Sequence, residues 1–189
     1  QGDAGPANWH EYLETVIKPV ETRVRMAISP ARTGEENEGF VFRDMSDIDV
    51  DACVAAIEDG GEHIWGIAVN VSDAGTGPND PKEILSRTLA AAERTGRPLL
   101  FGPRREPGDW PLEDQLELLR PGDVVTYCFH ETGGLLDERG QIVAAVRRAR
   151  ERGVLFDIGH GMASLDFGLA EAAIAQGFPP DTISTDLHK

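Results

Sequence analysis

The sequence VLFDIGHGMASLDFGLAEAAIAQGFPPDTISTDLH, residues 154–188, contains the pattern that decides the fold. It begins with a short apolar run, 154–160, continues through a helical stretch, 165–176, and closes with a second run, 182–188. Short apolar runs are typical of buried strands, and Gly177 stands where a helix commonly ends. The segment therefore predicts a strand, a helix and a second strand.

The same alternation extends over the rest of the chain. Further apolar runs predict strands at 23–29, 64–71, 98–102 and 123–130. Amphipathic stretches predict helices at 9–17, 47–58, 81–94, 112–119 and 141–152. Strands that alternate with helices favour parallel pairing through right-handed crossovers. Two architectures fit this order, a doubly wound sheet and a TIM-like (β/α)₈ barrel.

Polar residues at the strand ends favour the barrel. No G-x-G-x-x-G motif follows any predicted strand, which weakens the case for a nucleotide-binding sheet. Barrel active sites are built from polar side chains at the carboxyl ends of successive strands. Six predicted strands are too few for an eight-stranded barrel, which usually takes about 250 residues. We therefore expect residues 1–189 to form a single, incomplete α/β barrel domain of a longer protein.

Composition narrows the class of protein. The formal net charge of −15 argues against a nucleic-acid partner, which needs a basic surface. No apolar run approaches the roughly 20 residues that span a bilayer, and the first residues do not form a signal peptide. Cys53 and Cys128 lack CxxC spacing, which favours small core residues over ligands or a disulfide. We expect a cytoplasmic protein with a small-molecule substrate, and a homo-oligomer is left open.

Three strand ends carry residues suited to acid–base chemistry. One run ends at His130, a second contains Asp157 and ends at His160, and the third ends with Asp186 and His188. Histidine titrates near neutral pH, and a nearby carboxylate can act as a base or orient the ring. A single strand-end histidine is more often a packing residue, but three such ends at one mouth predict an acid–base pocket.

Two long stretches carry a family resemblance. GVLFDIGHGMASLDFGLAEAAIAQGFPPDTISTDLH, residues 153–188, and LRPGDVVTYCFHETGGLLDERGQIVAAVRRARERG, residues 119–153, resemble the dihydroorotase-like deacetylases of the amidohydrolase superfamily. The resemblance implies a (β/α)₈ barrel of which strands three to eight are present. It also implies one or two divalent metals, usually zinc, that activate water for attack on an amide or ester carbonyl. Asp186 in STDLH matches the aspartate that binds metal and shuttles the proton in that family.

At three other positions where the family has a metal ligand, this chain has a different type of residue. The resemblance aligns Ala68 in GIAV with a carboxylated lysine, Gly102 with a histidine, and Tyr127 in TYCFH with another histidine. A catalytic zinc needs about three protein ligands, so Asp186 alone cannot complete a binuclear site. Two alternatives remain: one zinc or other divalent metal held by Asp186 with an upstream HxH pair, or no metal.

We favour a hydrolase that acts on an amide, ester or lactone of a small carboxylate-bearing substrate. Asp186 would activate water, and Arg104 or Arg105 would bind the substrate carboxylate through paired hydrogen bonds. The residues that would polarise the carbonyl, protonate the leaving group or contact substrate are Tyr127, His130, His160 and His188. The alternatives are a non-catalytic relative that serves as a binding or scaffold subunit, and a lyase or isomerase that uses Tyr127 and His130.

Overall fold

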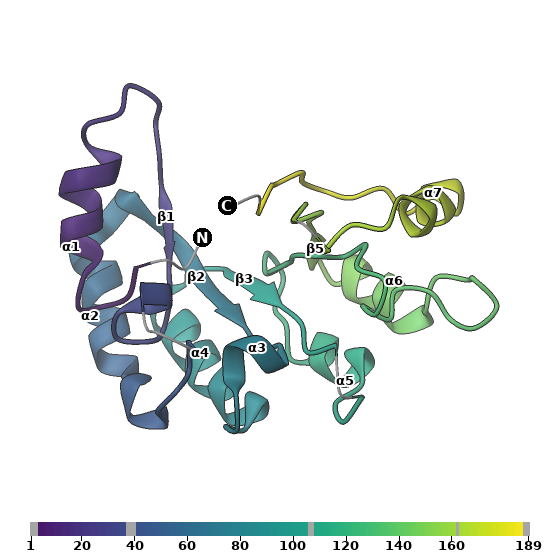
Figure 1. Ribbon diagram of the computed structural model, residues 1–189, viewed down its shortest axis with the longest axis horizontal. Coiled ribbons are helices and arrows are strands. Elements are labelled where there is room, and N and C mark those ends of the chain that lie inside the picture. Colours follow the sequence, from purple (N-terminus) through teal and green to yellow (C-terminus); the bar gives the residue numbers. More distant parts are fainter. Residues whose placement is uncertain (1–3, 37–40, 106–107, 162, 187–189) are drawn as a thin grey trace. The chain divides into compact units, whose positions relative to one another are not determined.

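A parallel sheet flanked by helices forms the framework of the chain (Figure 1). The computed structural model describes residues 4–36, 41–105, 108–161 and 163–186. In these residues the strands follow one another in the sheet in chain order: β1 (Met26–Ile28), β2 (Ile64–Asn70), β3 (Leu99–Gly102), β4 (Val124–Val125) and β5 (Leu155–Phe156). The predicted α/β class is thus confirmed, while closure of the sheet into a barrel stays a prediction.

The chain divides into two compact units, Gln1–Leu100 and Phe101–Lys189. In the first unit β1 pairs in parallel with β2, with Ile28 opposite Ile67. A Cβ added at Gly66 of β2 would lie 2.8 Å from the carbonyl oxygen of Pro98, so glycine allows close approach of the chain that enters β3. The prediction of one barrel domain over 1–189 stays a prediction.

Two capped helices cover the sheet of the first unit. Helix α2 (Val50–Gly60) packs against α4 (Pro81–Thr95), and α4 contacts β2. Each begins at an aspartate whose side chain accepts from a backbone N–H: Asp49 from Ala52 at 3.0 Å, and Asp80 from Lys82 at 2.9 Å. The fully buried residues of these elements include Ile64, Ile67, Ile84 and Leu85. Burial of these apolar side chains supplies the main stabilisation of the first unit.

Most predicted helices of the first unit are confirmed with small changes of bounds. The predicted helix 9–17 consists of α1 (Trp9–Tyr12) followed by a π-helical segment, Leu13–Ile17. Helix α2 begins after the predicted start because Met45–Asp47 form a 3₁₀ turn and Ile48 bridges to Ala31. A short helix, α3 (Asp73–Thr76), follows β2 and was not predicted.

The second unit packs three helices around an aromatic core. These are α5 (Leu112–Glu117), α6 (Ala144–Glu151) and α7 (Phe167–Ala175), and α5 contacts α6. Four phenylalanines are fully buried here: Phe101, Phe129, Phe156 and Phe178. The rings of Phe156 and Phe178 meet edge to face with centroids 5.1 Å apart, which is a preferred aromatic geometry.

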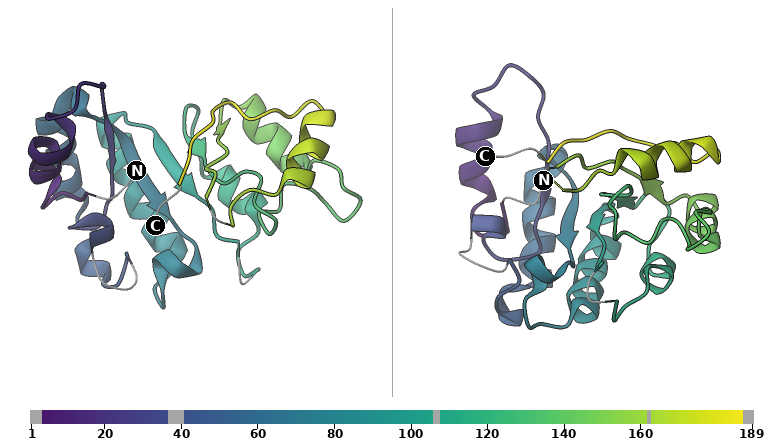
Figure 2. Two further views of the ribbon diagram at one scale, coloured as in Figure 1. Left: turned by 45° about the horizontal axis from the view of Figure 1, so that its top comes forward. Right: turned by 45° about the vertical axis from the view of Figure 1, so that its right-hand side comes forward.

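The last predicted strands are shorter or less regular than their sequence patterns suggest. The run 123–130 forms only the two residues of β4, because Tyr127 has φ 59° and a turn follows it. After β5, parallel pairing continues only as the bridges Asp157 to Thr182 and His160 to Thr185. Figure 2 shows the described part of the run 182–188 alongside the segment that follows β5. Over the described residues, 123–130 and 182–186, the prediction of full strands was therefore wrong in extent, although the parallel direction is correct.

No helix in the described ranges has the length and apolar character required to cross a bilayer.

Candidate active site

The centre of the candidate site is a hydrogen bond between Tyr127 and Asp186. The Tyr127 hydroxyl donates to Oδ2 of Asp186 at 2.9 Å, and both residues are half-buried. The backbone N–H of Asp186 donates to the carbonyl oxygen of His160 at 2.8 Å. Residues from three predicted strand ends therefore meet within the second unit.

The backbone on both sides of Tyr127 is held by neighbouring strands. The Thr126 N–H donates to the Phe101 carbonyl at 2.9 Å, and the Cys128 N–H donates to the Asp157 carbonyl at 3.1 Å. Tyr127 itself has φ 59°, a conformation that tyrosine adopts at a cost and only where its surroundings determine it. This backbone directs the ring toward Asp186.

Gly159 makes room for the Tyr127 ring. A Cβ at this position would lie 2.7 Å from Cδ1 of Tyr127 and 2.3 Å from the Thr126 hydroxyl oxygen. Gly159 also has φ 58°, which favours glycine. The glycine in DIGHG is therefore required by both the backbone and the packing of the aromatic ring.

A buried carboxylate lies behind the Tyr127–Asp186 pair. Asp157 is 2% exposed, and its side chain accepts hydrogen bonds from the hydroxyls of Thr126 at 2.9 Å, Thr182 at 2.7 Å and Ser184. Buried carboxylates are tolerated when such donors surround them. The sequence pattern does not reveal this network, because its donors come from segments far apart in the chain.

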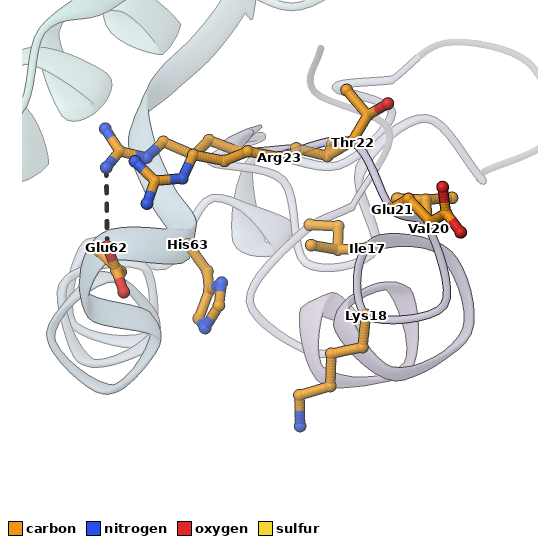
Figure 3. A pocket seen from close by; sticks show the side chains of 10 residues that line it. Ile17, Lys18, Val20, Glu21, Thr22, Arg23, Glu62 and His63 are labelled. Atoms are coloured by element: carbon orange, nitrogen blue, oxygen red, sulfur yellow. Dashed lines mark ion pairs between the residues drawn. The ribbon is translucent and has the colours of Figure 1, made fainter.

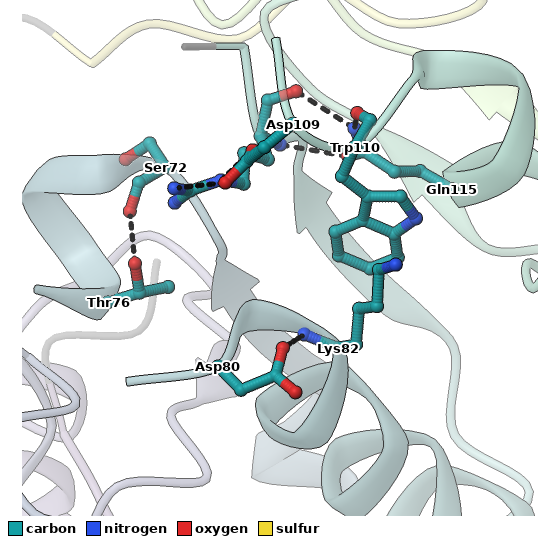
Figure 4. A network of polar contacts seen from close by, with 8 residues as sticks. Ser72, Thr76, Asp80, Lys82, Asp109, Trp110 and Gln115 are labelled. Atoms are coloured by element: carbon teal, nitrogen blue, oxygen red, sulfur yellow. Dashed lines mark hydrogen bonds and ion pairs between the residues drawn. The ribbon is translucent and has the colours of Figure 1, made fainter. Parts of the chain in front are cut away.

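The two candidate arginines have different surroundings. The Arg104 side chain is 8% exposed and pairs with Asp109 through two hydrogen bonds, at 2.8 Å and 3.1 Å. Gln115 adds hydrogen bonds to the Arg104 backbone and to the Trp110 carbonyl (Figure 4). The Arg105 guanidinium instead lies over the Tyr127 ring, with Cζ 5.4 Å from the centroid.

The remaining candidate residues are placed as follows. Nδ1 of His130 accepts from the Thr132 N–H at 3.1 Å, so in the neutral ring Nε2 carries the proton. His160 is half-buried and joins the site through its backbone. His188 lies outside the described residues.

The two cysteines have no catalytic environment. Both are buried and free, as predicted. Burial, and to a smaller extent the negative charge of Asp49, raises the pKa of the Cys53 thiol to about 12. Burial, and to a smaller extent the negative charge of Asp157, raises the pKa of the Cys128 thiol to about 12. A thiol with a pKa of about 12 stays protonated near neutral pH, so neither cysteine supplies a thiolate nucleophile there.

The side chains in the described ranges form no cluster suited to a metal ion. No three histidine, cysteine or carboxylate side chains gather there with the spacing that a metal ion requires. The Asp186 carboxylate accepts a hydrogen bond from the Tyr127 hydroxyl. The described residues therefore do not fit a binuclear zinc centre.

A separate pocket of about 270 Å³ belongs to the first unit (Figure 3). Its walls include Lys18, Arg23, Glu62 and His63, and Arg25 pairs with Glu62 at 3.6 Å. The predicted site residues all belong to the second unit, so none of them lines this pocket.

Comparison with solved structures defines the class of fold. A crystal structure of a dihydroorotase matches with a TM-score of 0.87 and 34% identity, over 99% of this chain and 58% of that chain. A crystal structure of an adenine deaminase matches with a TM-score of 0.88 and 28% identity, over 99% of this chain and 50% of that chain. These likenesses support an amidohydrolase-like α/β fold.

Sequence comparison identifies particular relatives. Deacetylase Atu3266 of Agrobacterium fabrum is 35% identical over 191 residues, which cover 99% of this chain and 46% of the relative. Proteins from Brucella anthropi and Enterococcus faecalis that also match are likewise named deacetylase. The chain spans about half the length of these curated relatives. No family model matches the sequence.

Proposed function

We propose that the protein is an amidohydrolase-type hydrolase that cleaves an amide, ester or lactone bond in a small carboxylate-bearing substrate. The observation that carries this proposal is the hydrogen bond from Tyr127 to Asp186. The names of the curated relatives, deacetylase, and the titles of the similar structures, dihydroorotase and adenine deaminase, support hydrolytic chemistry.

Asp186 acts as the general base that activates water. A positioned carboxylate contributes to such a step by taking the proton as water attacks the carbonyl carbon. The Tyr127 hydroxyl fixes the direction of the carboxylate, because it donates to Oδ2 at 2.9 Å. A carboxylate has about four acceptor positions on its two oxygens, and the Tyr127 hydroxyl occupies one of them on Oδ2.

Arg105 binds the substrate carboxylate. Arg104 is held by Asp109 in a two-bond pair, whereas Arg105 lies beside the Tyr127 ring. A guanidinium next to the base would hold an anionic substrate through charge-assisted hydrogen bonds and direct its scissile bond to Asp186. This assignment resolves the choice between the two arginines in favour of Arg105.

A histidine supplies the proton or the hydrogen bond needed on the other side of the carbonyl. In neutral His130 the proton is on Nε2, which makes that atom a donor to a carbonyl oxygen or a leaving group. His160 is the alternative donor, since its backbone contacts Asp186. No step is assigned to a metal, because the described residues supply Asp186 alone from the ligand set that the resemblance implies.

Substrate screening with a matched pair of variants tests the proposal. The panel contains acylated amino acids, hydroxy-acid esters and lactones. We expect Asp186→Asn to lower kcat by about 10²–10⁴-fold, as for loss of a general base. The control is Glu171→Gln, which removes an exposed carboxylate from α7 and should leave kcat unchanged. Full activity in Asp186→Asn would show that the assigned base is wrong.

Product analysis separates the rival functions. A hydrolase places an oxygen atom from isotopically labelled water in its product, whereas a lyase or isomerase would not. Inactivity on the whole panel, together with a stable partner in pull-down, would favour a binding or scaffold subunit. Metal analysis of the purified protein would reveal a bound zinc ion, and two metals per chain would contradict a site without the binuclear centre.

A further inference from the structure

Asp157 has the burial and the contacts of a residue that holds other groups in place. Its side chain is 2% exposed, and it lies directly after β5 in the second unit. A carboxylate so deeply buried is stable only when hydrogen-bond donors surround it, and here three hydroxyl groups do so. The arrangement is therefore sensitive to the loss of any donor.

The three donors belong to the two segments that carry the Tyr127–Asp186 pair. Thr126 directly precedes Tyr127 in the sequence, and Ser184 stands two residues before Asp186. Thr182 lies in the same segment as Ser184 and forms the parallel bridge with Asp157. One carboxylate thus connects the segment that supplies the hydroxyl with the segment that supplies the base.

Backbone hydrogen bonds place Asp157 between the same two segments. The Asp157 N–H donates to the Val125 carbonyl at 2.8 Å, and the Asp157 carbonyl accepts from the Cys128 N–H at 3.1 Å. On the other side, the Ile158 N–H donates to the Thr182 carbonyl at 3.3 Å. The side-chain hydrogen bonds of Asp157 therefore add to backbone contacts that already join it to both segments.

We infer that Asp157 is a positioning residue for the proposed reaction: it holds Tyr127 and Asp186 at hydrogen-bond distance through the hydroxyls of Thr126, Thr182 and Ser184. This inference rests on the proposed function for its catalytic consequence. Small displacements of a reacting group lower rates strongly, so the hydroxyl network sets the efficiency of the base. Asp157 itself needs no contact with the substrate.

Fluorine NMR tests the positioning role without any substrate. Tyr12 and Tyr127 are the two tyrosines of the sequence, so the chain labelled with fluorotyrosine gives two ring signals, which Tyr12→Phe assigns. We expect Asp157→Asn to move the Tyr127 signal and to leave the Tyr12 signal in place. Asp186→Asn serves as the reference, because it changes the partner of the Tyr127 hydroxyl directly.

Kinetics test the catalytic consequence once a substrate has been found. We expect Asp157→Asn to lower kcat by about 10²-fold, with KM within about twofold of the parent value, because the geometry of the base changes and the carboxylate-binding arginine does not. Thr126→Val should lower kcat in the same way, and Thr126→Ser, which keeps the hydroxyl, should restore it. Thr88→Val is the control, since Thr88 is also fully buried with a bonded hydroxyl, in α4 of the first unit.

Each outcome decides between the two claims. If Asp157→Asn does not fold, Thr126→Val and Ser184→Ala are measured in its place by the same two methods. An unmoved Tyr127 signal in a folded variant, or equal movement of both tyrosine signals, would overturn the positioning role. Normal turnover in Asp186→Asn would instead overturn the proposed function, and the Tyr127 signal would still show whether Asp157 holds the pair.

Discussion

The hydroxyl of Tyr127 and the carboxylate of Asp186 form a 2.9 Å hydrogen bond although 59 positions separate them in the sequence. The contact depends on the backbone of Tyr127, whose φ of 59° directs the ring, and on the Asp186 N–H, which is fixed to the His160 carbonyl. The family resemblance aligns Tyr127 with a metal-binding histidine. In this chain the same position carries a hydrogen-bond donor to the proposed base.

Removal of the Tyr127 hydroxyl should impair turnover more than folding. Tyr127→Phe keeps the ring but deprives half-buried Asp186 of a donor, so we expect kcat to fall by about ten- to a hundredfold. The measurement is steady-state kinetics on a substrate from the panel. Tyr12→Phe removes a hydroxyl from α1 of the first unit and should have no effect on kcat. Equal rates for both variants would exclude a role for the Tyr127 hydroxyl.

Substitution of the two arginines should separate binding from stability. Arg105→Ala should raise KM for an anionic substrate by about tenfold or more, since a charge-assisted hydrogen bond is lost. KM for the corresponding neutral amide should change much less. Arg104→Ala should lower the thermal midpoint, because it leaves Asp109 without this ion-pair partner. If KM for the anionic substrate rose only in Arg104→Ala, the substrate carboxylate would be assigned to Arg104 and not to Arg105.

Gly159 and Gly177 form a matched pair for a stability test. Gly159 has φ 58° and Gly177 has φ 75°. A Cβ added at Gly159 would collide with Tyr127 and Thr126, whereas a Cβ added at Gly177 would have no neighbour within 4 Å among the described residues. We expect Gly177→Ala to lower the free energy of unfolding by about 1 kcal/mol and Gly159→Ala by about 2 kcal/mol or more. Chemical denaturation measures both. Equal losses would mean that the Tyr127 ring is not packed against Gly159.

Stability should fall in alkaline solution because of the two buried thiols. Burial raises the pKa of Cys53 and Cys128 from the ordinary value of 9.0 to about 12. Between pH 9.0 and about 12, the unfolded chain loses thiol protons that the folded chain retains. The free energy of unfolding therefore decreases as the pH rises through this range. The double variant Cys53→Ala, Cys128→Ala should show a shallower decrease in denaturation at several pH values. An unchanged slope would contradict this assignment.

Helix bounds followed from local signals in the sequence. Asp80 and Pro81 predict the start of a helix at 81–94, and α4 occupies Pro81–Thr95 with Gly96 in the left-handed conformation at its end. These signals act within a few residues of the backbone they control. The alternation of strands and helices likewise predicted a parallel sheet.

Features that depend on distant contacts were not predictable in this way. The apolar run 123–130 does not reveal the positive φ of Tyr127 or the turn that ends β4. Strand ends made His160 and Asp186 candidates and the family resemblance added Tyr127, but the sequence could not identify Tyr127 as the donor to Asp186. The network around Asp157 was also hidden, because serine and threonine hydroxyls are common in loops and strands alike.

The left-handed backbone of Tyr127 has a consequence for substitutions at this position. Histidine is among the residues that tolerate a positive φ best, so Tyr127→His would introduce an imidazole without rebuilding the main chain. A ring that titrates near neutral pH could thus be placed opposite Asp186 without a change in the polypeptide path.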